Sequence, residues 1–199
     1  MIITINPDNP QQRLIAKVVD MLKKGAVIAY PTDTQYGLGC DLSQKKAIEK
    51  IYQLKDRSYK SPFSIICADL THISEYAVVS NFAYRTLKRL FPGPFTFILP
   101  GSKLVPQIML TKRHEVGLRV PNHPVAVGLV KALGRPLINT SAKLDSAKEA
   151  LTNPQEIETV FKGQVDAVID GGPVPGQPST IVSLVDDDPV ILRQGLGLF

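Results

Sequence analysis

Short apolar runs of five to seven residues recur between amphipathic stretches along the chain, and this alternation constrains the fold more than any other feature. Runs of this length are typical of buried β-strands when turn residues bound them. The runs are AVIAY (26–30), FSIICA (63–68), FTFILP (95–100), VGLRVP (116–121), PLINTSA (136–142) and VDAVID (165–170). The tail STIVSLVDDDPVILRQG holds two further apolar runs around an acidic turn, which predicts a β-hairpin.

The stretches between these runs show helical spacing and the residues that begin and end helices. Pro10 and Gly25 bound a segment whose apolar residues share one helical face. Ser43 is the candidate N-cap of a helix over 43–54 that carries Lys55 at its exit. Further helices are predicted after Asp69, after Ser80 or Asn81, at about 123–133 and at about 154–161.

Helices and strands alternate first, and strands dominate later in the chain. This order predicts a mixed, twisted sheet in an α/β or α+β fold. A length of 199 residues suits one well-packed domain, so we expect a single domain over residues 1–199.

The cysteines and the hydropathy of the chain indicate the compartment in which the protein is expected. The chain has two cysteines, Cys40 and Cys67, and its opening MIITINPDNP does not resemble a secretory leader. No apolar run approaches the roughly 18 residues that a membrane span needs. We therefore expect a cytoplasmic protein with reduced thiols and no membrane partner.

Positive charge is concentrated in the first 143 residues. They carry 20 Lys and Arg against 9 Asp and Glu, a net of +11, whereas residues 144–199 carry 3 against 9, a net of −6. An anionic partner is expected at the basic part. Tight nucleic-acid binders contact on the order of 6 to 10 phosphates, so the excess of positive charge is large enough for a nucleic acid or a smaller polyphosphate.

The common nucleotide and metal motifs are absent from the sequence. There is no GxxxxGK[ST], no GxGxxG and no GxSxG elbow. The three histidines, His72, His114 and His123, are scattered and form no HExxH pattern, so no protein-held metal is predicted.

Polar residues instead gather where the predicted elements end, and loops at such places usually carry binding groups. The candidates are YPTDTQYGLG (30–39) with Thr32, Thr34 and Tyr36, KDRSYK (55–60) with Lys55, Arg57 and Lys60, RVPNHP with Arg119, NTSAK with Thr140, Ser141 and Lys143, PST with Ser179, and LRQG with Arg193. Two of these motifs also have a purely structural interpretation. YPTDTQYGLG could be a turn whose hydroxyl groups bond to their own backbone, and KDRSYK could place cations at the negative end of a helix dipole. The loop GGPVPGQPS (171–179) is either a surface connection or a place where glycines let backbone amides approach a phosphate or ribose.

Taken together and in order, seven blocks resemble the YrdC/YciO family, which includes threonylcarbamoyl-adenylate synthases. The blocks are VIAYPTDTQYGLGCD, LKDRSYKSPFSIIC, FPGPFTFILP, VGLRVPNHPVA, INTSA, PSTIVSL and ILRQG. The resemblance runs from about residue 7 to residue 197, and the opening PDNPQQRLI is most similar to the YciO branch. It implies a single domain whose twisted sheet curves round a concave, basic cleft.

The resemblance also implies a reaction and its site residues. Synthases of this family convert L-threonine, bicarbonate and ATP into threonylcarbamoyl-AMP and pyrophosphate, for the modification of a tRNA adenosine. The implied ATP-binding residues are Lys55, Arg57, Lys60, Thr140, Ser141, Lys143, Ser179 and Arg193, with Lys55 and Arg57 catalytic. Thr32, Thr34 and Tyr36 are implied to line the threonine pocket, with Arg119 on the threonine carboxylate.

One position departs from the family pattern of Lys-x-Arg followed by Ser-x-Asn, because Lys143 stands where asparagine is expected. The implied chemistry brings two anions together, so the cations serve to neutralise charge, and Mg²⁺ is expected to be bound through the ATP phosphates. The departure keeps a second interpretation open. The protein could bind double-stranded RNA or tRNA through the same fold, with weak or no synthase activity.

Overall fold

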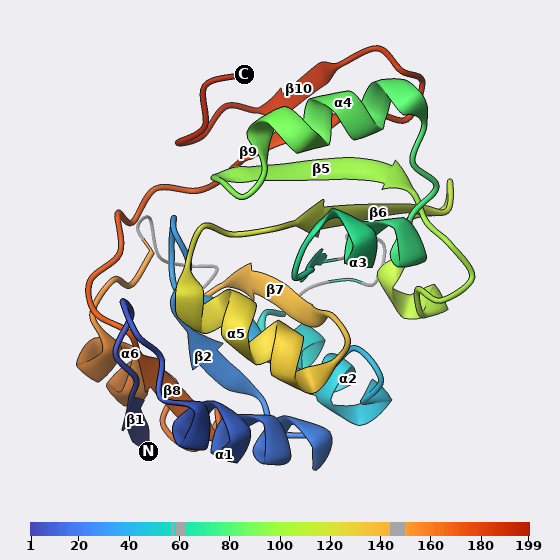
Figure 1. Ribbon diagram of the computed structural model, residues 1–199. Helices are drawn as coiled ribbons and strands as arrows, with labels where there is room; N and C mark the ends of the chain where they lie inside the picture. The colour runs from blue at the N-terminus through green and yellow to red at the C-terminus, as the bar shows by residue number, and fades with distance from the viewer. Residues whose placement is uncertain (57, 59–62, 144–149) are drawn as a thin grey trace.

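In the part of the chain that the structure describes, ten strands form one mixed sheet, with the N-terminus near one edge and the C-terminus near the other (Figure 1). The computed structural model describes residues 1–56, 58, 63–143 and 150–199. Within them the strands are β1 (Ile2–Thr4), β2 (Ile28–Tyr30), β3 (Gly37–Gly39), β4 (Ser64–Ile66), β5 (Phe95–Pro100), β6 (Glu115–Arg119), β7 (Leu137–Ser141), β8 (Ala167–Asp170), β9 (Thr180–Ser183) and β10 (Val190–Arg193). Their order across the sheet is β1-β8-β2-β3-β7-β4-β6-β5-β9-β10, with parallel and antiparallel pairs. The predicted α/β fold with a mixed sheet is confirmed.

Helices fill the intervals between strands, as the sequence pattern predicts. They are α1 (Gln12–Lys23), α2 (Lys45–Leu54), α3 (Leu70–Tyr76), α4 (Asn81–Leu90), α5 (Pro124–Leu133) and α6 (Pro154–Val160), with a short 3₁₀ helix η1 (Gln107–Met109). The Asp69 side chain accepts a hydrogen bond from the His72 amide, and the Ser80 side chain accepts one from the Ala83 amide, which confirms both predicted caps. Every helix in the described ranges is too short or too polar to cross a bilayer.

The helices cover the two faces of the sheet unequally. α1 and α5 lie side by side and pack on one face, over β8, β2 and β7 (Figure 1). On the opposite face α2, α3 and α4 pack against β4, β5 and β6, and α6 packs against β2 and β8. The β5 and β6 side chains that point to the same face as α1 and α5 belong to none of the apolar clusters of the described residues. This part of the sheet is therefore free to form a polar site.

Two strands were not predicted from the sequence, β1 and β3. β3 consists of Gly37, Leu38 and Gly39, and glycine is usually depleted in strands because it packs nothing. Here close packing requires it. A Cβ at residue 39 would lie 2.3 Å from the Ile138 carbonyl oxygen, and one at residue 37 would lie 2.5 Å from the Asn139 side chain.

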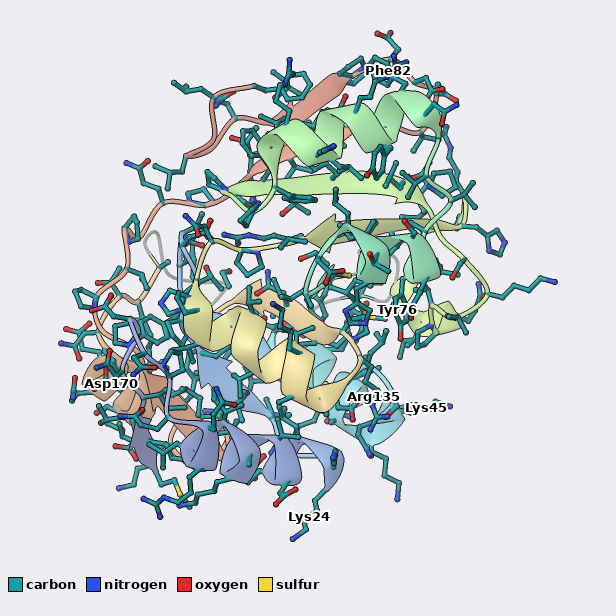
Figure 2. The ribbon with its side chains drawn as sticks, viewed as in Figure 1. Lys24, Lys45, Tyr76, Phe82, Arg135 and Asp170 are labelled. Carbon is teal, nitrogen blue, oxygen red and sulfur yellow. The ribbon has the colours of Figure 1, made fainter. Side chains whose placement is uncertain are left out.

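The predicted N-cap of α2 is wrong. The helix begins at Lys45, and its N-cap residue Gln44 makes no side-chain capping bond. Ser43 instead donates a hydrogen bond to the buried Asp41 carboxylate at 2.9 Å, and this carboxylate also accepts one from the Arg135 Nε at 2.9 Å. Figure 2 labels Arg135 in the turn between α5 and β7, near the start of α2. The buried carboxylate needs these donors, and this requirement takes Ser43 away from the helix end.

The two buried thiols predict a loss of stability at alkaline pH. Cys40 and Cys67 are both buried, and burial raises the pKa of each thiol. An unfolded thiol titrates near pH 8.5, so above this pH the native state holds more protons than the unfolded state. The free energy of unfolding is then expected to fall, by up to about 1.4 kcal/mol per pH unit for each thiol.

Urea unfolding at pH 8 and pH 10 measures this effect, with the double variant Cys40→Ala/Cys67→Ala as control. The variant should lose stability more slowly between the two pH values than the wild type does. Equal losses in the two proteins would contradict the thiol assignment.

Candidate functional site

The part of the sheet without helices holds a cavity of about 270 Å³. Arg119 on β6 pairs with Ile66 on β4, so the two side chains point to the same face of the sheet. Ile66 belongs to the apolar cluster under α1 and α5. The cavity therefore lies on the face of the sheet that α1 and α5 cover elsewhere. The cavity is lined by Thr34, Gln35, Tyr36, Phe63, Ser64, Thr96, Ile98, Thr111, Glu115, Val116, Gly117, Arg119, Asn139, Thr140, Ser141, Ser179, Ile181 and Arg193. Most of these residues are polar, so the cavity suits a ligand with many hydrogen-bonding groups.

Small residues on neighbouring strands make room for this cavity. Ser64 on β4 pairs with Asn139 on β7. A Cβ on Gly117 of β6 would lie 3.3 Å from the Ser64 Cβ and 3.4 Å from the Thr96 methyl group. Larger residues at these positions would fill the floor of the cavity.

Arg119 is the most buried charged group of the cavity, with 3% of its surface exposed. Its Nη2 donates to Asp33 Oδ1 at 2.5 Å and to Thr34 Oγ1 at 2.7 Å. Its Nε has no hydrogen-bond partner among the described residues. Burial lowers the pKa of Arg119, while the neighbouring Asp33 acts in the opposite direction. A buried guanidinium with an unused donor beside a cavity fits a carboxylate or phosphate oxygen.

The three residues predicted for the threonine pocket take different positions. Thr34 and Tyr36 line the cavity, whereas Thr32 does not. The Thr32 hydroxyl donates to the Gln35 carbonyl at 2.6 Å and accepts from the amides of residues 34 and 35, both at 3.2 Å. Thr32 therefore shapes the turn that presents Thr34, which is the structural role considered for this motif.

The Gly- and Pro-rich loop 171–179 is tied to this turn. The Tyr36 hydroxyl donates to the Gly172 carbonyl at 2.8 Å, and the Gly176 amide donates to the Thr34 carbonyl at 2.8 Å. The loop follows Asp170, which Figure 2 labels at the end of β8 and whose carboxylate accepts from the Gly172 amide at 3.0 Å. Burial raises the pKa of Tyr36 to about 12, so its hydroxyl stays protonated as a donor.

Ser179 and Arg193, at the two ends of the C-terminal hairpin, meet at the cavity. The Arg193 Nη2 donates to the Ser179 carbonyl at 2.8 Å and to its hydroxyl at 3.3 Å. Thr96 and Ser179 share a hydrogen bond at 2.9 Å. The C-terminal hairpin places these groups together, because β9 follows Ser179 and β10 ends at Arg193.

Lys55 is buried and does not belong to the lining of the cavity. Its ammonium donates to the carbonyls of Lys143 and Ser141, the latter at 3.5 Å. Lys55 thus joins the exit of α2 to the end of β7, where Thr140 and Ser141 line the cavity. Arg57 and Lys60, also predicted to bind ATP, lie outside the described residues.

Several residues of the cavity were not predicted, and most share one signal. Thr96 and Ile98 on β5, and Glu115 and Gly117 on β6, alternate with core residues of the same strands. Such alternation marks the second face of a strand, and it was readable from the sequence. Asp33, which forms an ion pair with Arg119, lies inside the PTDT motif, but no role was predicted for it.

Comparison with known proteins gives a consistent family match. A family model named Sua5/YciO/YrdC, with the description telomere recombination, matches residues 20–195. A protein named uncharacterized protein YciO, from Escherichia coli K12, is 43% identical over 194 residues, covering 97% of this chain and 94% of that protein. The crystal structure of E. coli YciO superimposes with a TM-score of 0.94 at 42% identity and covers 99% of this chain and 96% of that one.

Two further relatives are named for an activity or a ligand. The threonylcarbamoyl-AMP synthase of Bacillus subtilis is 34% identical over 195 residues, which cover 96% of this chain and 55% of that protein. The crystal structure of Sua5 from P. abyssi, complexed with L-threonine, gives a TM-score of 0.90 at 30% identity and covers 98% of this chain and 57% of that one. This chain therefore spans slightly more than half the length of these two relatives.

Proposed function

We propose, because the chain belongs to the Sua5/YciO/YrdC family, that it is an ATP-dependent L-threonylcarbamoyl-AMP synthase. The proposed reaction joins L-threonine, bicarbonate and ATP and releases pyrophosphate. The observation that carries the proposal is the buried Arg119, whose Nε lacks a partner among the described residues beside a cavity rich in hydroxyl groups. The names of the synthase relatives and of the threonine complex support it.

In this proposal the threonine carboxylate binds Arg119. The guanidinium is held in place by Asp33 and Thr34, so little ordering is needed when the ligand arrives. Thr34 and Tyr36 would complete the pocket, since both line the cavity next to the guanidinium's partners. Bicarbonate would be bound in the same cavity, where the amine of threonine can reach it.

The nucleotide is assigned to the end of β7 and to the C-terminal hairpin. Ser141 and Thr140 line the cavity there, and Arg193 and Ser179 line it from the C-terminal hairpin. Lys55 anchors the backbone at Ser141 and Lys143, and we assign Lys55 and Lys143 to the phosphates together with Arg57 and Lys60. Within the described residues no three His, Cys, Asp or Glu side chains gather as a metal site, so Mg²⁺ would be held through the phosphates of ATP.

Charge neutralisation would supply much of the rate. The carbamate oxygen attacks the α-phosphorus, the bond to the β-phosphate breaks, and pyrophosphate leaves with that electron pair. A pair of unit charges at about 4 Å is worth roughly 4 kcal/mol at an effective dielectric of 20, against about 1 kcal/mol in water. Cations at a sheltered site are therefore more effective than cations on the surface.

Threonine-dependent release of pyrophosphate tests the proposal. The wild type, mixed with ATP, Mg²⁺, bicarbonate and L-threonine, should release pyrophosphate, and Lys55→Ala should lower the rate by on the order of 100-fold. Lys103→Ala, which removes an exposed lysine that does not line the cavity, serves as the matched control and should retain the wild-type rate. Release that does not depend on threonine, or that Lys55→Ala leaves unchanged, would count against the synthase.

A second candidate is binding of double-stranded RNA or tRNA through the same basic region. The +11 net charge of residues 1–143 favours it. Affinity that is governed by phosphate contacts should fall steeply with salt concentration. A flat salt response in a filter-binding titration would exclude this candidate.

A further inference from the structure

We infer that Asn139 donates a hydrogen bond to the oxyanion that forms when the amine of the amino acid adds to bicarbonate. This inference rests on the proposed function of the cavity and assigns the place of bicarbonate within it. It goes beyond the residues that the family motifs suggest, because Asn139 belongs to neither the Lys-x-Arg nor the Ser-x-Asn pattern.

The amide of Asn139 is held at both ends. Its Oδ1 accepts from the Tyr30 hydroxyl at 3.0 Å, and its Nδ2 donates to the Ser64 hydroxyl at 3.3 Å. Asn139 and Ser64 both line the cavity. An NH₂ group carries two N–H donors, and the second makes no hydrogen bond to another described residue. The side chain is therefore a pre-oriented donor at the wall of the cavity.

The surrounding structure is specifically shaped to hold this amide. Tyr30 is fully buried, and its one O–H is shared between Asn139 Oδ1 and the Ile138 carbonyl at 3.2 Å, so the hydroxyl is fixed in place. A Cβ on Gly37 would lie 2.5 Å from Asn139 Oδ1 and 3.3 Å from the Tyr30 ring. Glycine at position 37 thus leaves the space that the Tyr30–Asn139 pair occupies. A donor fixed in advance costs no reorganisation when charge develops.

The position of Asn139 relative to the other groups assigns it to the carboxylation step. Asn139 pairs with Ser64 on β4, and two residues further along β4 Ile66 pairs with Arg119. In the other direction, Ser141 lies two residues beyond Asn139, on the same side of β7. Burial raises the pKa of Tyr30, which holds Asn139, and the Arg119 guanidinium acts in the opposite direction. Asn139 therefore lies between the carboxylate site and the phosphate site.

The chemistry between these two sites is the addition of the amine to bicarbonate. The amine is bonded to the carbon next to the carboxylate, so a carboxylate on Arg119 brings the amine toward Asn139. The amine, after losing its ammonium proton to solvent, forms a C–N bond to the bicarbonate carbon, and the C=O electron pair moves onto oxygen. The adduct then expels hydroxide, which takes the proton from nitrogen and leaves as water, so that the carbamate remains. Negative charge on the oxygen atoms is greatest in this adduct, and a neutral N–H donor stabilises it more than it stabilises bicarbonate.

The test is the bicarbonate dependence of pyrophosphate release in Asn139→Leu, which keeps the volume and removes the donor. We expect kcat/KM for bicarbonate to fall by about 100-fold, the usual loss for an oxyanion donor. Affinities for L-threonine and for ATP, measured by calorimetry, should stay close to those of the wild type. Asn139→Ser, which restores a small donor, should recover part of the bicarbonate dependence.

Control variants separate this role from a structural one. Tyr30→Phe removes the hydroxyl that orients the amide and should give a smaller loss of the same kind, whereas Asn153→Ala removes the N-cap of α6 and should leave the bicarbonate dependence unchanged. Unaltered bicarbonate dependence in Asn139→Leu, or an equal loss of threonine and ATP affinity, would overturn the inference while the synthase proposal stands. A wild-type protein without threonine-dependent release would overturn the synthase proposal and the inference with it.

Discussion

Arg119→Met is expected to abolish binding of L-threonine, with an affinity loss on the order of 100-fold or more. The guanidinium is buried, and removal of one partner from a desolvated, charge-assisted contact costs roughly 2 to 5 kcal/mol. Methionine keeps much of the side-chain volume, so the cavity should not collapse. Isothermal titration with L-threonine measures the effect directly.

The same substitution is expected to destabilise the fold, and this effect must be separated from the loss of binding. Asp33, whose side chain is 12% exposed, would lose its ion-pair partner, at a cost of about 3 to 5 kcal/mol. The double variant Arg119→Met/Asp33→Asn removes the stranded charge. It should regain much of the stability in urea unfolding but none of the threonine affinity. Recovery of binding in the double variant would show that Arg119 acts through the fold and not on the ligand.

Gly39→Ala is the second substitution with a large expected effect. Its Cβ would lie 2.3 Å from the Ile138 carbonyl oxygen and 2.7 Å from the Tyr30 ring, and neither can move away cheaply. The β3–β7 pairing would have to shift, and overpacking of this kind costs about 1 to 3 kcal/mol or more. Thermal or urea unfolding measures the loss.

Gly128 provides the matched control for Gly39→Ala. It lies inside α5, where a Cβ meets the Ile15 methyl group at 3.6 Å, an ordinary contact distance. Gly128→Ala is therefore expected to raise stability, by about 0.5 to 1 kcal/mol, because alanine favours the helix. Equal effects of the two substitutions would contradict the packing argument for β3.

The helices and most strands were predictable because local signals and tertiary packing agree. Asp69 and Ser80 are N-caps both by residue type and by hydrogen bonding. β3 was not predictable, since the close approach of Ile138 that requires glycine is a tertiary contact. The predicted Ser43 N-cap was wrong for a related reason, because the Ser43 hydroxyl donates to the buried Asp41 carboxylate. A cap prediction considers neighbours in sequence, whereas a buried carboxylate draws donors from across the fold.

The candidate site was predictable as a set of motifs but not as a geometry. Resemblance brought Thr34, Tyr36, Arg119, Ser141, Ser179 and Arg193 together, and all of them line one cavity. It did not reveal that Thr32 structures the turn or that Lys55 anchors a backbone segment. Asn139 was missed because its role depends on Tyr30 and Ser64, which reach it from other strands.

The central claim, that Arg119 receives the carboxylate of L-threonine in this cavity, is tested most directly by a crystal structure with L-threonine and ATP. The account predicts a carboxylate oxygen within about 2.7 to 3.2 Å of the Arg119 Nε, which then gains the partner that it lacks among the described residues. The phosphates should lie near Ser141 and the Lys55 side chain. Threonine bound elsewhere, or bound in the cavity with its carboxylate turned away from Arg119, would contradict the account.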